Sequence, residues 1–288
     1  MASSKPAILV ISSHVVRGTV GNRAAAFALE VLGFPVWCIP TITLPWHPGH
    51  GPATRSVPDQ AAFDAILDDL AHSPWLNEIG AVLTGYLGAP GQVNSVARLV
   101  HAVKERNPTA LYALDPVIGD GDSLYVAEEQ AAGIRDQLLP LADLVTPNCF
   151  ELGWLAGSPT PTAQHECCKL SASLGAARVL TTSAPALMQG YTGNLLTEFG
   201  NNKGRAQMAE HPSLNGPPNG LGDLTAALMT GHLLDGRSGS DALTKTTASV
   251  FEVMAHAAQT KSDELALEQN VDSLRTPRTA IQTRSLII

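Results

Sequence analysis

Residues 7–32 read AILVISSHVVRGTVGNRAAAFALEVL. Ala7–Ser12 is an apolar run of strand length, and Asn22–Leu32 places apolar residues at helical spacing before Gly33, a residue type that often ends a helix. This stretch therefore predicts a buried strand followed by a helix, the βα unit from which parallel sheets are built.

The same alternation continues along most of the chain. Further strands are predicted at Val36–Thr41, Ala81–Thr84, Ala110–Leu114, Asp143–Thr146 and Arg178–Thr182. Helices are predicted at Pro58–Leu70, Gln92–Arg106, 128–139, Cys149–Ala156, 163–174, 223–234 and 240–259. Because parallel strands need crossover connections, this order predicts an α/β fold with a mostly parallel central sheet and helices on both faces. We expect residues 1–288 to form a single domain, with ligands at the carboxyl ends of the strands.

Two regions depart from this alternation. Tyr191–Leu196 and Ala206–Ala209 flank Gly200-Asn201-Asn202, a strong turn signal, and so predict an antiparallel hairpin at the sheet edge. From Val271 onward the sequence shows no clear period, and we expect an irregular tail.

The segment from Ile42 to Val57 is too rich in proline and glycine for a helix and too long for a simple connection. It favours a functional loop or flap, with an ordinary surface excursion as the alternative. His47 and His50 lie within it, but a pair of histidines without a third ligand does not predict a zinc site.

Composition excludes several classes of partner. The formal net charge is −8, and the clusters of Lys and Arg that bind nucleic acid or anionic membranes are missing. Charged residues and prolines interrupt the N-terminal apolar region, so we predict neither a signal peptide nor a membrane span, and we expect a soluble, cytoplasmic protein. The four cysteines form no C-x-x-C pair and are expected to be reduced, packed thiols without an assigned function: Cys38, Cys149, Cys167 and Cys168.

The turn Asn219-Gly220-Leu221-Gly222-Asp223 follows Pro217-Pro218 and precedes an apolar helical run. A helix start has free backbone N–H groups and partial positive charge, so a glycine turn there can hold an oxyanion or a phosphate. Asp223 has two interpretations at this stage, as a residue that caps the first turn or as part of a site. A carboxylate near a positive helix end stays ionised, so either role requires no raised pKa.

Polar residues also follow the predicted strands, where the fold rule places a site: Ser13, His14, Tyr86, Asp115, Asn148 and Glu151. With the glycine turn they form the arrangement expected for a hydroxyl group that attacks a magnesium-bound nucleoside triphosphate. Asn148-x-x-Glu151 places two side chains on one helical face, where they can hold magnesium waters or can cap the helix. No P-loop is present, so a P-loop enzyme is excluded. No G-x-G-x-x-G turn follows the first strand, which argues against a dinucleotide enzyme.

The order and identity of these motifs resemble those of the pyridoxal (vitamin B6) kinases of the ribokinase-like superfamily, and the resemblance covers nearly the whole chain. The Ser-His-Val-Val and Val-Gly-Asn motifs are particular to B6 kinases, whereas the Gly-x-Gly-Asp turn and Asn-x-x-Glu belong to the wider superfamily. The matching segments are Ser13–Gly18, Val20–Ala25, Gly85–Gly88, Asp115–Asp120, Thr146–Leu152 and Gly220–Leu224.

The resemblance implies ATP-dependent phosphorylation of the 5′-hydroxyl group of pyridoxal, pyridoxine or pyridoxamine, with ATP and Mg²⁺ and, optionally, a monovalent cation such as K⁺. It also implies a homodimer. Asp223 would be the base that accepts the hydroxyl proton, and the backbone N–H groups of Gly220, Leu221 and Gly222 would form the anion hole. With Asp223, the substrate pocket would comprise Ser13, Val20, His47 and Tyr86. The nucleotide side would comprise Asp115, Thr146, Asn148, Glu151, Thr181, Thr182 and Ser183, with Asp115 and Glu151 serving magnesium directly or through water.

The sequence departs from the family pattern in the long loop and in the glycine turn. B6 kinases usually have Ser-Asn-His-Thr-Gly-Tyr in the long loop, whereas residues 45–50 here are Pro-Trp-His-Pro-Gly-His, so Pro48 replaces a threonine hydroxyl. Leu221 replaces the usual threonine between the glycines, and its side chain could narrow the phosphate approach. The altered loop leaves two alternatives open: a kinase for another hydroxymethyl heterocycle such as hydroxymethylpyrimidine, and a non-catalytic vitamer-binding protein.

Overall fold

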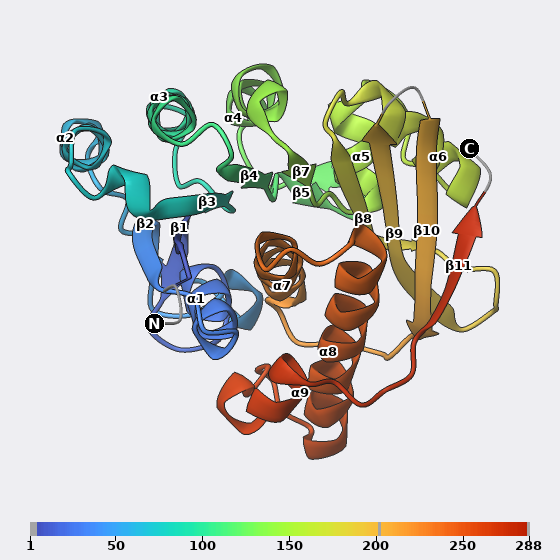
Figure 1. Cartoon of the computed structure of the whole chain (residues 1–288). Helices are drawn as coiled ribbons and strands as arrows, with labels where there is room; N and C mark the ends of the chain where they lie inside the picture. The colour runs from blue at the N-terminus through green and yellow to red at the C-terminus, as the bar shows by residue number, and fades with distance from the viewer. Residues whose placement is uncertain (1–4, 201–202, 287–288) are drawn as a thin grey trace.

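The computed structural model describes residues 5–200 and 203–286. A nine-stranded sheet in the order β11-β10-β9-β8-β7-β4-β3-β1-β2 crosses the molecule (Figure 1). Its parallel part comprises β1 (Ala7–Val15), β2 (Val36–Leu44), β3 (Ile79–Thr84), β4 (Leu111–Leu114), β7 (Leu144–Val145) and β8 (Arg178–Pro185). Three antiparallel strands extend it: β9 (Tyr191–Gly200), β10 (Lys203–Pro212) and β11 (Gln282–Leu286). In a separate hairpin, β5 (Gly119–Asp120) pairs antiparallel with β6 (Ser123–Leu124), and each of these strands has two residues.

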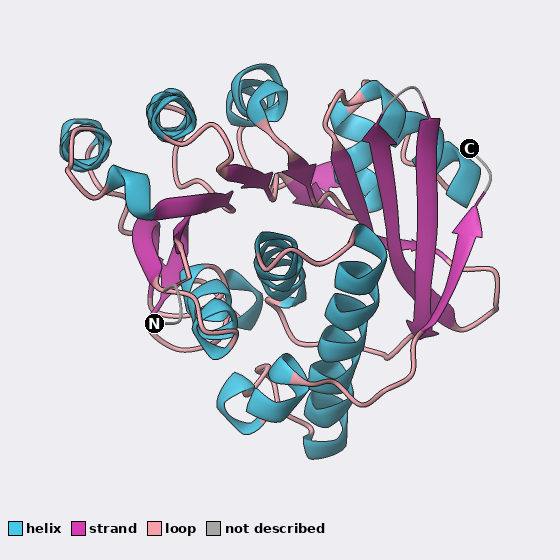
Figure 2. Ribbon diagram, in the orientation of Figure 1, coloured by secondary structure: helices cyan, strands magenta, loops and turns pink. Residues whose placement is uncertain are grey.

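Helices cover both faces of the sheet (Figure 2). One face carries α2 (Gln60–Ala71), α3 (Gln92–Arg106), α4 (Glu128–Gly133), α5 (Cys149–Leu155) and α6 (Gln164–Ser173), and the other carries α1 (Asn22–Val31), α7 (Leu221–Leu234), α8 (Gly239–Thr260) and α9 (Val271–Arg275). Short turns of 3₁₀ helix lie at Pro48–His50 (η1), Leu76–Glu78 (η2), Leu139–Leu141 (η4) and Leu267–Gln269 (η5), and a π-helical turn lies at Ile134–Leu138 (η3).

Side chains of each strand alternate between the two faces of the sheet, and this alternation explains why the molecule has two hydrophobic cores. Leu9 and Ile11 of β1 belong to the core under α2–α6, whereas Ile8 and Val10 belong to the core under α1, α7 and α8. Successive side chains of a strand point to opposite faces, so an unbroken apolar run is what a strand covered on both sides requires. The predicted α/β architecture is confirmed.

Several predicted details are wrong. β1 and β2 continue to Val15 and Leu44, three residues beyond the expected ends, and pair there through Val15 and Leu44. The 128–139 helix is interrupted by the π-helical turn, and the β5–β6 hairpin was not predicted. The turn expected at Gly200-Asn201-Asn202 has its two asparagines outside the described residues.

The tail from Val271 onward is regular rather than irregular. It forms α9 and then β11, which pairs antiparallel with β10. The predicted hairpin therefore lies one strand in from the sheet edge. The QTRSL sequence of β11 has no apolar run, because an edge strand buries little, and Arg284 holds it by donating to Glu210 (3.1 Å) and Gln164 (2.7 Å).

Backbone hydrogen bonds align the carboxyl ends of the parallel strands. The N–H groups of Asp115 and Thr146 donate to the last carbonyl groups of the neighbouring strands, Thr84 (2.8 Å) and Leu114 (3.0 Å), and the N–H group of Gly85 donates to Ile11 within β1 (3.0 Å). The residues that follow β3, β4 and β7 consequently lie side by side along one edge. The order in which strands are added to the sheet reverses at β1: β2 lies on one side of it and β3 on the other. Sheets of this kind bind ligands at such a switch point.

No helix in the described part of the chain is long and apolar enough to cross a membrane. The four cysteines are free thiols.

Candidate active site

The glycine turn forms the start of α7, as expected. Gly220 is the N-cap residue, with a φ of 97°, and a Cβ atom there would lie 2.2 Å from the Thr19 carbonyl oxygen. Both the left-handed backbone and this close packing require glycine. Among the described contacts, the N–H groups of Gly220, Leu221 and Gly222 have no acceptor within the protein. They remain available for an anion at the positive end of the helix.

The Leu221 side chain packs against the core under α1, α7 and α8. This packing places at least part of the side chain on the core side of the turn. A Cβ atom on Gly222 would meet no atom within 4 Å, so the turn is open on its outer side.

Asp223 is the third residue of α7 and not its N-cap, and no side chain caps this helix. Burial raises the pKa of its carboxyl group to about 6, and the N–H groups of Gly21 and of Asp223 itself partly oppose that rise. The sequence had suggested that no raised pKa was needed, but desolvation outweighs the helix end. Asp223 is still ionised at neutral pH. Its Oδ1 lies beside the end of β3, 3.7 Å from the position of a Cβ atom on Gly85.

Asp115 and Thr146 lie together, as predicted. The Thr146 hydroxyl group donates to Asp115 Oδ1 at 2.9 Å, and Asp115 is 6% exposed. Burial raises the pKa of Asp115 well above its ordinary range, and the charges of Glu151 and Asp223 raise it further. The carboxyl groups of Glu151 and Asp223 therefore lie close enough to Asp115 for their charges to act on it.

Asn148 and Glu151 form a capping box at the start of α5. The Asn148 side chain accepts the Glu151 N–H (2.9 Å), and Glu151 Oε2 accepts the Asn148 N–H (3.0 Å). Glu151 Oε1 accepts the N–H of Ile118 (2.9 Å), and burial raises the pKa of Glu151 to about 7. Because backbone N–H groups occupy both carboxylate oxygens, this arrangement favours the capping role over direct metal ligation.

The Thr181–Ser183 segment is divided between the core and the rim. Thr181 is fully buried and pairs with Leu195 inside the sheet. Thr182 lies beside Asn148, and its N–H donates to the Pro147 carbonyl at 2.9 Å. Ser183 has a φ of 51° where the β8 register breaks. Only Thr182 and Ser183 therefore lie at the edge that carries Asn148.

The predicted substrate residues lie around the ends of β1 and β2. Val20 and Tyr86 join Val15, Ile42 and Leu44 in a small apolar cluster separate from the two main cores. Ser13 is 8% exposed, and its Oγ lies against Gly21, whose N–H interacts with Asp223. The structure thus brings Ser13, Val20 and Tyr86 to the Asp223 side of the sheet edge.

The flap, residues 42–57, folds back over this region. Mutual backbone hydrogen bonds between Thr43 and Ser56 close its base (2.8 and 3.0 Å), and Arg55 donates to the Tyr86 hydroxyl at 3.0 Å. A Cβ atom on Gly49 would lie 3.0 Å from Asn219 Nδ2, so the flap tip lies on the residue that precedes the glycine turn.

His47 is the predicted substrate residue of the flap. Its Nδ1 accepts the Gly49 N–H at 3.1 Å, and burial and the charge of His50 lower its pKa. It is therefore neutral at pH 7. Pro48 begins the 3₁₀ turn η1, so the departure from the family pattern shapes this tip.

Comparison with known proteins agrees with this geometry. A sequence model of the phosphomethylpyrimidine kinase family matches residues 60–268. The pyridoxal kinase PdxY of Corynebacterium diphtheriae is 32% identical over 97% of this chain and 99% of its own length, and that of Leifsonia xyli is 35% identical over 94% and 96%. The chain belongs to the pyridoxal kinase family.

A solved structure supports the assignment at the level of the fold and of the ligands that a family member binds. The pyridoxal kinase from Leishmania donovani, in complex with ADP and pyridoxamine, is 26% identical and has a TM-score of 0.91. The similarity covers 98% of this chain and all of that one. The pyridoxal kinase fold thus extends through the antiparallel edge as well as the parallel sheet.

Tyr125 is a site residue that the sequence did not identify. Burial of its hydroxyl group, and then the charges of Glu151, Asp115 and Asp223, raise its pKa, although the residue as a whole is 53% exposed. It follows the β5–β6 hairpin, which comes between Asp115 and Asn148 in the chain. An aromatic residue just after a glycine-rich turn was the only signal available.

Proposed function

We propose that this protein transfers the γ-phosphoryl group of ATP to the 5′-hydroxyl group of a B6 vitamer: pyridoxal, pyridoxine or pyridoxamine. The observation that carries the proposal is the start of α7, where the half-buried Asp223 lies next to free N–H groups. Membership of the pyridoxal kinase family and the ADP and pyridoxamine bound to a relative of the same fold support the choice of substrates.

The roles of the residues follow from their positions. Asp223 orients the substrate hydroxyl group and takes its proton as the bond to phosphorus forms, and the N–H groups of Gly220, Leu221 and Gly222 stabilise the charge on the phosphoryl group. Alignment and charge stabilisation are what phosphoryl transfer requires, and a rigid helix start supplies both. Ser13, Val20, His47 and Tyr86 would hold the vitamer against Asp223.

The nucleotide would lie along the next part of the sheet edge, against Thr146, Asn148, Thr182 and Ser183, with Thr181 supporting them from within the sheet. Tyr125 would donate its hydroxyl hydrogen to a phosphate oxygen, since its raised pKa keeps it protonated.

The residues present fit Mg²⁺ held mainly by water and phosphate. Within the described residues, no three His, Cys, Asp or Glu side chains are placed to hold a metal by themselves. Asp115 is nonetheless a buried carboxyl group on which the charges of Glu151 and Asp223 act. A divalent cation would stabilise the ionised form of such a group. Asp115 would hold the ion directly or through water, and Glu151 would hold it through water. The ion would neutralise negative charge on the triphosphate. The family resemblance also implies a K⁺ ion near the anion hole, and we include it in the proposal.

The proposal treats residues 1–288 as one cytoplasmic kinase domain that assembles as a homodimer. Light scattering on the purified protein tests the dimer, and comparison of rates in K⁺ and in Na⁺ tests the monovalent cation.

A coupled ADP-release assay tests the activity. It uses ATP, Mg²⁺ and each of pyridoxal, pyridoxine, pyridoxamine and hydroxymethylpyrimidine. We expect ADP with at least one B6 vitamer. The matching phosphomethylpyrimidine kinase model and the Pro48 substitution favour hydroxymethylpyrimidine as the second candidate, and turnover with that compound alone would select it. ADP with none of them would favour a vitamer-binding protein.

A further inference from the structure

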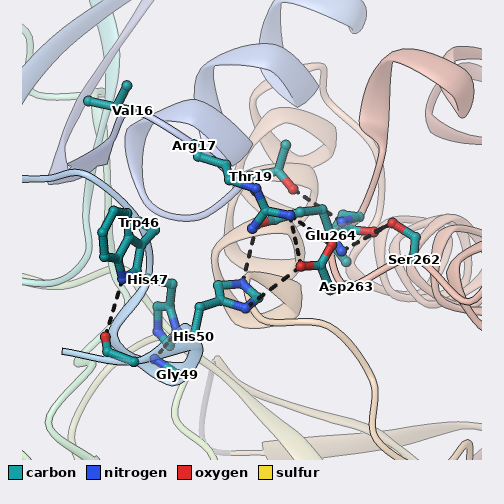
Figure 3. A network of polar contacts seen from close by, with 12 residues as sticks. Val16, Arg17, Thr19, Trp46, His47, Gly49, His50, Ser262, Asp263 and Glu264 are labelled. Atoms are coloured by element: carbon teal, nitrogen blue, oxygen red, sulfur yellow. Dashed lines mark hydrogen bonds and ion pairs between the residues drawn. The ribbon is translucent and has the colours of Figure 1, made fainter. Parts of the chain in front are cut away.

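Three loops from distant parts of the chain meet at one carboxylate, that of Glu264 (Figure 3). Its Oε2 accepts the backbone N–H of Thr19 (3.2 Å), and its Oε1 accepts from Arg17 Nη1 (3.1 Å) and lies 3.3 Å from His50 Nε2. Thr19 and Arg17 belong to the β1–α1 loop, His50 belongs to the flap, and Glu264 follows α8. The Glu264 side chain is only 17% exposed.

Each of the two loops that Glu264 contacts borders the candidate site. The Thr19 carbonyl oxygen lies against Gly220, and the next residue, Val20, lines the apolar cluster with Tyr86. The flap carries His47, and its tip lies on Asn219. No described hydrogen bond or ion pair joins Glu264 to a predicted substrate residue, although its charge acts on His47. Its main contacts are therefore with the two loops.

Glu264 stands on a rigid base. Lys261 ends α8 in a left-handed conformation, with a φ of 54°, and the Ser262 N–H donates to the Ala257 carbonyl (2.9 Å). The Ser262 hydroxyl group then donates to the Glu264 carbonyl (2.8 Å) and accepts the Glu264 N–H (3.1 Å). Opposite it, a Cβ atom on Gly18 would lie 2.7 Å from Glu264 Oε1, so the β1–α1 loop fits closely around the carboxylate.

The contacts of Glu264 are better shielded than those of its neighbour Asp263. Asp263 pairs with Arg17 (2.7 Å) but both side chains are more than half exposed, and it lies 3.8 Å from His50. Exposed pairs of this kind contribute little and are screened by salt. His50 and Glu264 are 22% and 17% exposed, so this shielded contact joins the flap to the segment after α8. It adds to the backbone hydrogen bond from Arg17 to Pro45 (2.9 Å) and to the contact between Arg55 and Tyr86, which also hold the flap.

We propose that Glu264 is a positioning residue for phosphoryl transfer. Through His50 it holds the flap, and through Thr19 and Arg17 it holds the β1–α1 loop, so that the two walls of the vitamer pocket are in place before substrate binds. Preorganised loops reduce the ordering cost of binding. The inference rests on the proposed function. B6 kinases usually have tyrosine where this chain has His50, so the contact between His50 and Glu264 distinguishes this sequence within the family pattern.

The test compares the wild-type protein with Glu264→Gln, which keeps the size of the side chain and an acceptor for Thr19 but removes the charge. Trypsin reports on the flap without substrate, because Arg55 lies within it. We expect cleavage after Arg55 to be about tenfold faster in Glu264→Gln and the KM for the preferred vitamer to rise about tenfold, as befits loss of a charged hydrogen bond. The KM for ATP and kcat should change less than about twofold.

Glu268→Gln is the matched control, since it removes a carboxylate four residues away whose described contact is with Gln269 at 3.4 Å. It should behave as wild type. His50→Gln, a change on the flap, removes only the flap contact and should reproduce the faster cleavage and a rise in the vitamer KM. The double variant should cleave no faster than Glu264→Gln, because both single variants remove the contact between the flap and Glu264. This second variant keeps the test decisive if Glu264→Gln does not fold.

Equal cleavage rates in wild type, Glu264→Gln and His50→Gln would overturn the inference. Faster cleavage with an unchanged vitamer KM would overturn the role in the reaction. If wild type releases no ADP with any vitamer, the proposed function has failed instead, and the cleavage rates then decide by themselves whether Glu264 holds the flap.

Discussion

At the scale of single residues, burial decides the chemistry of the acidic groups more than the helix ends do. Asp223 is in the first turn of α7, where partial positive charge favours its ionised form. Its pKa is nevertheless raised to about 6 because the carboxyl group is desolvated. A base with such a pKa is ionised at neutral pH and holds a proton more readily than an exposed aspartate, which suits general-base catalysis.

Replacing Asp223 with asparagine removes the proton acceptor and keeps the shape of the side chain. We expect Asp223→Asn to lower kcat by about 10²–10⁴-fold, the usual contribution of a general base, while leaving the fold and ligand binding in place. Coupled ADP release measures turnover, and the rise in melting temperature with ATP and vitamer measures binding. Near-normal turnover in this variant would refute the role of Asp223.

If Asp223 is the base, as proposed, its pKa should set the acid limit of activity. The base works only when it is ionised, so kcat/KM should be constant above about pH 7 and fall by about tenfold per unit below pH 6, as Asp223 takes up a proton. A pH series of initial rates checks this, with thermal unfolding at each pH to show that the fold persists. If kcat/KM instead fell only near pH 4, the range in which an exposed aspartate titrates, Asp223 would not be the titrating group.

The sequence predicts site residues well where backbone position alone determines their place. Asp115, Thr146 and Tyr86 follow strands, and the sheet edge brings such residues together whatever their side chains do. Glu151 and Thr181 show the limit, because the partners that occupy or bury them come from other segments. Nothing in the sequence next to Glu151 or Thr181 indicates those contacts.

At the scale of elements, the α7 start depends on a glycine that packs against another loop. A side chain at Gly220 would require an unfavourable left-handed backbone and would collide with the Thr19 carbonyl oxygen, so either α7 or the β1–α1 loop must shift. The free N–H groups and Val20 would then lose their alignment.

We therefore expect Gly220→Ala to reduce kcat/KM by about 10²-fold or more, since misplacement of about 1 Å has that effect, and to destabilise the protein by about 1–3 kcal/mol. Steady-state kinetics and urea unfolding measure the two effects. Gly222→Ala is the control, because a Cβ atom there meets nothing within 4 Å. Equal losses in both variants would argue against the packing explanation.

Elements with strong periodicity were predicted closely, and α3 was predicted to its ends. β11 was missed because an edge strand with one neighbour carries polar residues and leaves no apolar pattern. The flap was recognised from its prolines and glycines, but its position was not, since its contacts come from distant segments: Tyr86, Asn219 and Glu264.

At the scale of the whole molecule, the parallel half of the sheet carries the candidate site and the antiparallel strands complete the sheet beyond it. β11 pairs with β10 alone, and its Arg284 contacts Glu210, whose side chain is 12% exposed. The end of the chain thus protects an edge that lies several strands away from Asp223 (Figure 1).

Removing residues 280–288 should therefore separate stability from catalysis. The truncated protein loses the β10–β11 ladder and exposes the β10 edge, so we expect a melting temperature lower by about 5 °C or more and faster aggregation on warming. KM and kcat measured at low temperature should stay within about twofold of the full-length values, because no residue of the candidate site is removed. Scanning calorimetry, light scattering and the ADP assay follow the three properties, with Arg284→Gln as a milder variant that keeps the strand. A large loss of turnover at a temperature where the truncated protein is folded would mean that the antiparallel edge shapes the site directly.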